Sequence, residues 1–126
     1  MITKTLASTI MLSVALSFSS MTFAAKLDQN MHTLAKNYKA FNKSHNQKDA
    51  LKALDNMKAA ALDAKKVKLK TNDVKAPSSD VLFDQLVAEI DKTRALVQAG
   101  KLDQAKVEGK KINAVKEQGH AIYHPN

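Results

Sequence analysis

Residues 80–100, DVLFDQLVAEIDKTRALVQAG, contain the clearest helical pattern in this chain. Apolar side chains recur at steps of three and four, from Phe83 through Ile90 to Val97. This spacing places them along one face of an α-helix. Gly100 follows, and glycine commonly ends a helix. The stretch therefore predicts one amphipathic helix, whose apolar face other elements must cover.

Three further segments have the same helical period, and nothing in the chain resembles a strand. They cover residues 27–41, 48–66 and 102–123. Turn-forming residues separate them at 42–47 (NKSHNQ) and at 67–79 (VKLKTNDVKAPSS). Four amphipathic helices with short connections are typical of an antiparallel up-down-up-down bundle. The sequence therefore predicts an all-α four-helix bundle.

The first 24 residues have the composition of an export signal. Lys4 supplies the positive charge, an apolar run without charges follows, and Thr22 and Ala24 are small residues suited to cleavage after Ala24. A membrane anchor is the alternative, since such a run could span a bilayer, but serine and threonine dilute it. We therefore expect a signal peptide at 1–24, a bundle domain at 25–126, and no membrane insertion after cleavage.

The composition limits the classes of function. The whole chain has a formal net charge of +8, which becomes +7 when Lys4 is removed with the signal peptide. The lysines are spread along the whole chain, a pattern more typical of a solvated surface than of nucleic-acid binding. The chain has no cysteine, so no disulfide can stabilise it. Nucleophile–base pairs and carboxylate dyads are not apparent, so we expect no enzymatic activity.

The bundle topology predicts that a methionine and a histidine lie at the same end. Met31 is near the start of the first helix and His120 near the end of the last, and these two helices are antiparallel. At a rise of 1.5 Å per residue, each lies roughly 6 Å from that end. Phe83, near the start of the third helix, lies there too. A thioether and an imidazole form an unusual zinc site, but they are a known axial pair for haem iron.

The C-terminal sequence QGHAIYHPN (118–126) leaves a second interpretation open. His120 and His124 are four residues apart, which places them on one face of a helix and could form a copper or zinc pair. However, His124 precedes Pro125, which disfavours helix at that position, and no third ligand is evident nearby. We favour His120 as a single axial ligand.

Several motifs resemble the cytochrome b562 family over residues 27–124. They are LDQNMHTL (27–34), MKAAALDAKK (57–66), FDQLVAEID (83–91), AGKLDQAK (99–106) and GHAIYH (119–124). This family is itself a standard example of the up-down-up-down bundle. The resemblance implies one non-covalent haem b per chain, with Met31 and His120 as ligands, and periplasmic electron transfer by a monomer between unidentified redox partner proteins. It also implies a pocket lined by residues that match Leu27, Leu34, Met57, Leu62 and Phe83.

Three further positions are expected to contact the haem, and two positions differ from the family pattern. Ile112 would exclude water from the haem, while Lys116 and His124 would neutralise its propionates. Ser79 replaces an aromatic residue of the family, and Gly119 replaces a tyrosine of its best-known member. Both changes remove bulk from the expected pocket. The alternative hypothesis is therefore a haem-free periplasmic bundle that acts as a binding or stress protein.

Overall fold

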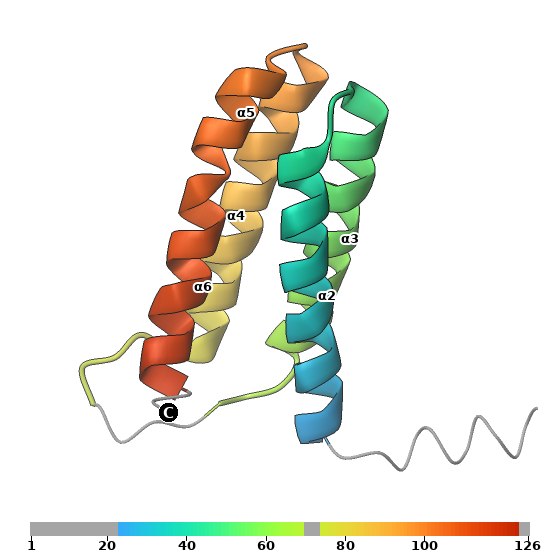
Figure 1. Cartoon of the computed structure of the whole chain (residues 1–126). Coiled ribbons are helices and arrows are strands. Elements are labelled where there is room, and N and C mark those ends of the chain that lie inside the picture. The colour runs from blue at the N-terminus through green and yellow to red at the C-terminus, as the bar shows by residue number, and fades with distance from the viewer. Residues whose placement is uncertain (1–22, 70–73, 124–126) are drawn as a thin grey trace, which may run out of the picture.

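A computed structural model describes residues 23–69 and 74–123, and within those ranges it contains helices and no strand (Figure 1). The helices are α2 (Phe23–Lys43), α3 (Gln47–Lys65), α4 (Ser79–Gln98), α5 (Leu102–Glu108) and α6 (Lys110–Tyr123). Helices α5 and α6 follow each other along nearly one line and together form the fourth arm of a bundle. The predicted all-α four-helix bundle is confirmed.

The arms alternate in direction, as the short connections require. Helix α2 packs against α3, α3 against α4, and α4 against both α5 and α6. The start of α2, the end of α3, the start of α4 and the end of α6 therefore lie at one end of the bundle (Figure 1). The predicted signal peptide, residues 1–24, lies outside the described ranges except for its last two residues. Among the described helices, none is both long and apolar enough to cross a membrane.

The core combines large side chains from every arm with alanines from α3. Ile112 of α6 is 2% exposed, and the largest of the fully buried side chains are Leu34, Phe41, Leu54, Met57, Ile90, Thr93 and Val97. The Thr93 hydroxyl donates to the Glu89 carbonyl at 2.8 Å, which satisfies this buried polar group. Buried alanines on α3, such as Ala53 and Ala61, let neighbouring helices approach closely.

The helix ends follow local sequence signals. Asn46 caps α3 by accepting the Asp49 backbone N–H at 2.8 Å. Gly100 has φ 78°, the left-handed conformation that glycine adopts without strain. The Lys101 N–H reaches the Leu96 carbonyl across it at 2.9 Å, the hydrogen bond of a Schellman motif. The predicted stop at Gly100 is confirmed.

The predicted single helix over 102–123 is wrong at Gly109, where α5 ends and α6 begins. A β-carbon built on Gly109 would lie 2.8 Å from the Phe41 ring atom Cε2. The ring of Phe41 on α2 thus packs directly on the Gly109 backbone. The Ile112 N–H turns back to the Gly109 carbonyl at 3.0 Å, the tighter spacing of a 3₁₀ turn. The interruption accompanies close contact between the first and last arms.

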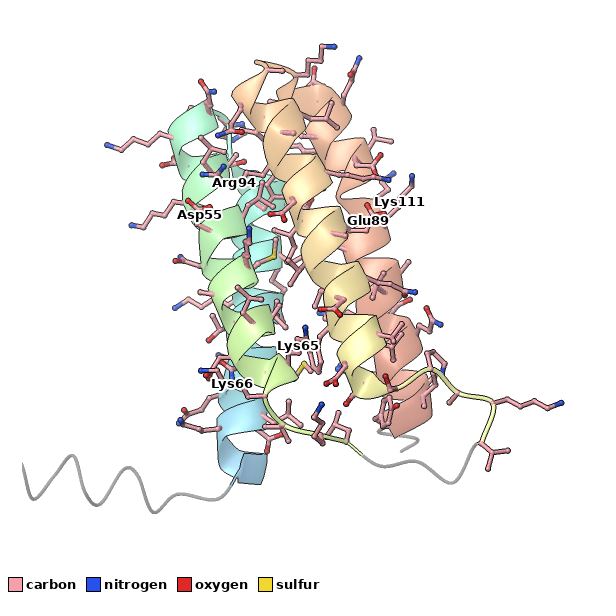
Figure 2. All side chains as sticks on the ribbon, turned by 180° about the vertical axis from the view of Figure 1, so that it is seen from behind. Asp55, Lys65, Lys66, Glu89, Arg94 and Lys111 are labelled. Atoms are coloured by element: carbon pink, nitrogen blue, oxygen red, sulfur yellow. The ribbon has the colours of Figure 1, made fainter. Side chains whose placement is uncertain are left out.

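Ion pairs join α3 to α4 along the surface. Arg94 Nε lies 2.7 Å from Asp55, and Lys65 Nζ lies 2.6 Å from Asp84 (Figure 2). The hydrogen bond that Lys65 donates to the Asp84 carboxylate raises the pKa of Lys65. Because exposed ion pairs contribute at most about 1 kcal/mol each, they favour one alignment of the two helices more than they stabilise the fold. They also neutralise basic side chains on this side of the bundle.

Candidate functional site

An apolar cavity lies at the end of the bundle where α2 starts and α6 ends. Its cavity volume is about 40 Å³, and the wider space between its lining side chains, about 430 Å³, includes open solvent. Its lining comes from α2, α4, α6 and the connection after α3. The lining residues are Met31, Leu69, Ser79, Leu82, Phe83, Leu86, Val115, Lys116, Gly119, His120 and Tyr123.

The two predicted axial ligands line this cavity from opposite arms. Met31 is on α2 and is partly buried, while His120 is on α6, in its last turn, and is exposed. They are 89 positions apart in the sequence, so the antiparallel arrangement of the first and last arms brings them together. A thioether side chain and an imidazole side chain therefore line one apolar space.

Helix α4 supplies one wall of the cavity. Leu82, Phe83 and Leu86 are 5%, 6% and 3% exposed and lie on two successive turns. Gly119 of α6 faces this wall, since a β-carbon there would lie 3.9 Å from Leu82 Cδ1, an ordinary contact distance. The absence of a side chain at Gly119 leaves this part of the cavity wider than a larger residue would.

The connection between α3 and α4 is tied down beside the cavity by two hydrogen bonds. The Leu69 N–H donates to Ser79 Oγ at 3.1 Å, and the Tyr123 hydroxyl donates to the Pro77 carbonyl at 2.6 Å. Ser79, which replaces an aromatic residue of the resembled family, is only 3% exposed. Its buried hydroxyl has the Leu69 N–H as its hydrogen-bond partner. These bonds hold Leu69 against the cavity and fix the end of α6.

Lys116 lies on the α6 face that is turned toward α2. Its Nζ is 6.0 Å from the centroid of the Tyr38 ring, a distance at which a cation–π attraction operates. Because Lys116 also lines the cavity, it carries a positive charge beside an otherwise apolar space. An acidic group of a bound molecule would find a partner there.

The remaining predicted site residues lie elsewhere. Four of them belong to the buried core and do not line the cavity: Leu27, Leu34, Met57 and Ile112. Leu62 is 45% exposed and also does not line it. The neighbouring Ala61 is fully buried, and adjacent residues of a helix point about 100° apart, so Leu62 is turned outward. His124 lies outside the described residues.

Sequence reasoning did not assign several lining residues to the site. Leu82 and Leu86 are spaced like one face of a helix. However, Leu82 directly precedes Phe83, and periodicity could not show that Leu82 and Phe83 are both buried. Leu69 lies in the segment 67–79, whose apolar residues show no helical periodicity. Tyr123 continues the periodic face of the last helix, a signal that could have included it.

The donor set suits a haem iron better than a bare metal ion. Within the ranges 23–69 and 74–123, there is no group of three or more His, Cys, Asp or Glu side chains that could bind a metal. A thioether and an imidazole facing an apolar cavity instead match the axial ligation of a haem whose macrocycle is kept dry. The cationic Lys116 fits the acidic edge of such a group.

Comparisons with known proteins agree with this chemistry. The cytochrome b562 family model matches residues 26–124. The probable soluble cytochrome b562 1 of Yersinia pestis is 30% identical over 115 residues, covering 86% of this chain and 91% of that protein. The probable soluble cytochrome b562 2 of the same organism is 36% identical over 97 residues, covering 72% and 76%. The chain therefore belongs to the cytochrome b562 family, whose members are b-type cytochromes.

Proposed function

We propose that the cavity binds one non-covalent haem b, with Met31 and His120 as its axial ligands, and that the protein transfers electrons. One observation carries this proposal: the two side chains come from opposite arms and line the same apolar cavity. Haem iron with this ligand pair passes one electron at a time between its ferrous and ferric states. The chain has no cysteine, so thioether attachment of the haem is excluded.

The other lining residues support the same role. Leu82, Phe83 and Leu86 exclude water, and a dry environment is one of the factors that set the reduction potential of a haem. Lys116, and His124 outside the described residues, are suited to neutralise the propionates. With two axial ligands in place, no coordination position remains for a substrate. This agrees with the family, which consists of electron carriers and not enzymes.

The cellular location follows from the signal peptide that the sequence predicts. Export and cleavage after Ala24 would place a monomer of residues 25–126 in the periplasm, where it would exchange electrons with redox partner proteins. Cell fractionation followed by mass measurement of the mature protein tests this. A protein retained with its first 24 residues in the membrane fraction would contradict it.

Haem titration of residues 25–126 tests the cofactor and the ligands together. We expect a sharp Soret band at one haem per chain and a distinct α band on reduction. Met31→Ala should shift these bands and lower the reduction potential, because the thioether favours ferrous iron. His120→Ala should weaken haem binding by at least tenfold. His32→Ala is the matched control, since this histidine adjoins Met31 but is exposed and does not line the cavity.

The haem-free alternative gives the opposite result. It is favoured by the exposure of His120 and by the lack of a side chain at Gly119, which both leave this side of the cavity open. Under this alternative, the mature chain would show no sharp Soret band at one equivalent of haem. Bands unchanged by both Met31→Ala and His120→Ala would likewise refute the axial ligation proposed here.

A further inference from the structure

The positive charges of this protein are compensated unevenly over its surface. Carboxylates of α3 and α4 pair with the basic side chains of that side of the bundle (Figure 2). On α2, by contrast, Lys36, Lys39 and Lys43 are exposed. Within the described part of the chain, none of these three lysines makes an ion pair. Exposed lysines outside these ion pairs also occur on other elements, such as Lys52 on α3 and Lys110 on α6, but on α2 three of them lie within eight residues.

These lysines form a continuous surface along α2. With His32 they follow one another at steps of four, three and four, so they lie on one face of the helix. Together with Ala35 and Ala40 they border a shallow depression. We call these six residues the α2 basic surface. Its rim is cationic and its floor is formed by small apolar side chains, which leaves room for a protruding anionic group.

The α2 basic surface adjoins the candidate haem site. His32 is the next residue after Met31, and Lys36 is five residues beyond Met31, or about 7.5 Å along the helix axis. Across from α2, Lys116 on α6 approaches Tyr38 and adds another positive charge. Lys43 is twelve residues, or about 18 Å, beyond Met31, so a partner bound at the end of the surface formed by His32 and Lys36 would lie closest to the cavity.

We propose that the α2 basic surface docks an acidic face of the protein with which this cytochrome exchanges electrons. The inference rests on haem binding in the adjacent cavity. Opposite charges would steer the two proteins together and orient the partner toward the haem. A membrane surface fits less well, because a helix that lies on a bilayer presents an apolar stripe to it. The apolar stripe of α2, including Leu34 and Phe41, is buried in the core.

The test compares two charge reversals in the haem-loaded protein. Lys36→Glu/Lys39→Glu alters the α2 basic surface. Lys48→Glu/Lys101→Glu is the control. It makes the same net charge change with exposed lysines at the end of the bundle away from the cavity. The reduced proteins are mixed with hexacyanoferrate(III), an anion that accepts one electron from each ferrous haem, and with tris(phenanthroline)cobalt(III), a cationic one-electron acceptor. Poly-L-glutamate serves as an acidic polypeptide that competes for docking.

We expect Lys36→Glu/Lys39→Glu to slow oxidation by hexacyanoferrate(III) by about tenfold at low salt, since steering changes such rates by 10-fold or more. The same variant should react faster with the cobalt complex, and poly-L-glutamate should slow the wild type but not this variant. Both charge effects should vanish near 0.5 M salt, where screening is strong. The control variant should change either rate less than about twofold.

Two results would overturn the inference. Equal changes in both variants would show that overall charge, not the α2 basic surface, controls the rates. Sedimentation of the wild type with phosphatidylglycerol vesicles, lost in Lys36→Glu/Lys39→Glu, would assign the surface to lipid. Loss of the haem bands would concern the proposed function instead, so the absorption spectrum of each variant, recorded first, separates the two failures.

Discussion

Two glycines of the last arm should respond oppositely to the same substitution. Gly109→Ala and Gly119→Ala each add one methyl group to a right-handed helical stretch. The Gly109 β-carbon would lie 2.8 Å from Phe41 Cε2, whereas the nearest contact at Gly119 is 3.9 Å away. We expect Gly119→Ala to stabilise the fold and Gly109→Ala to destabilise it.

The magnitude follows from two contributions to the free energy of unfolding. Alanine is more favourable than glycine inside a helix by about 1 kcal/mol, and this gain applies at Gly119, inside α6, but not in full at Gly109, which lies between α5 and α6. At Gly109 the new methyl would be roughly 0.7 Å closer to Phe41 than the usual carbon–carbon separation. The Phe41 ring is fully buried and cannot move into solvent, and overpacking of this kind costs about 1–3 kcal/mol. This cost, with the smaller helix gain at Gly109, makes Gly109→Ala less stable than Gly119→Ala.

Denaturant unfolding of haem-free residues 25–126, followed by circular dichroism, measures both variants without a contribution from haem binding. The wild-type value should lie between the two, and each 1 kcal/mol corresponds to roughly 4–8 °C in Tm for a domain of this size. Phe41→Leu should partly relieve the Gly109→Ala defect, so a double-mutant cycle should give a coupling of about 1 kcal/mol. Equal stabilisation by both alanines would refute close packing of Phe41 on Gly109.

Two further predictions concern single hydrogen-bonding groups. Burial, together with the adjacent Glu108 carboxylate, raises the pKa of Glu89, so its protonated form is favoured in the fold and its contribution to stability is lost as pH rises through that pKa. Glu89→Gln should therefore stabilise the protein by about 1 kcal/mol at neutral pH and have little effect at pH 4. Thermal unfolding at both pH values measures the two effects, and an equal effect at both would contradict the raised pKa. Tyr123→Phe removes the 2.6 Å hydrogen bond to the Pro77 carbonyl and should lower the free energy of unfolding by about 1 kcal/mol. It should also speed haem transfer to apomyoglobin. An unchanged transfer rate would show that this hydrogen bond does not retain the haem.

Part of the candidate site could be predicted, because topology alone brings distant residues together. Met31 and His120 were expected at one end once four antiparallel helices were inferred, and both line the cavity. The lining by Leu82 and the outward orientation of Leu62 could not be predicted. Each is next to another apolar residue, and periodicity identifies a face without showing which of two neighbours lies at its centre.

The sequence by itself determined the all-α class, the approximate helix ranges and the helix stop at Gly100, because local periodicity and backbone preferences act within a few residues. The tertiary structure alone decided the interruption at Gly109, the partner of Ser79 and the pairing of Lys116 with Tyr38. These features depend on how helices far apart in the chain rotate and approach one another. The contact of Phe41 with Gly109 joins residues 68 positions apart, and no pattern local to either residue contains it.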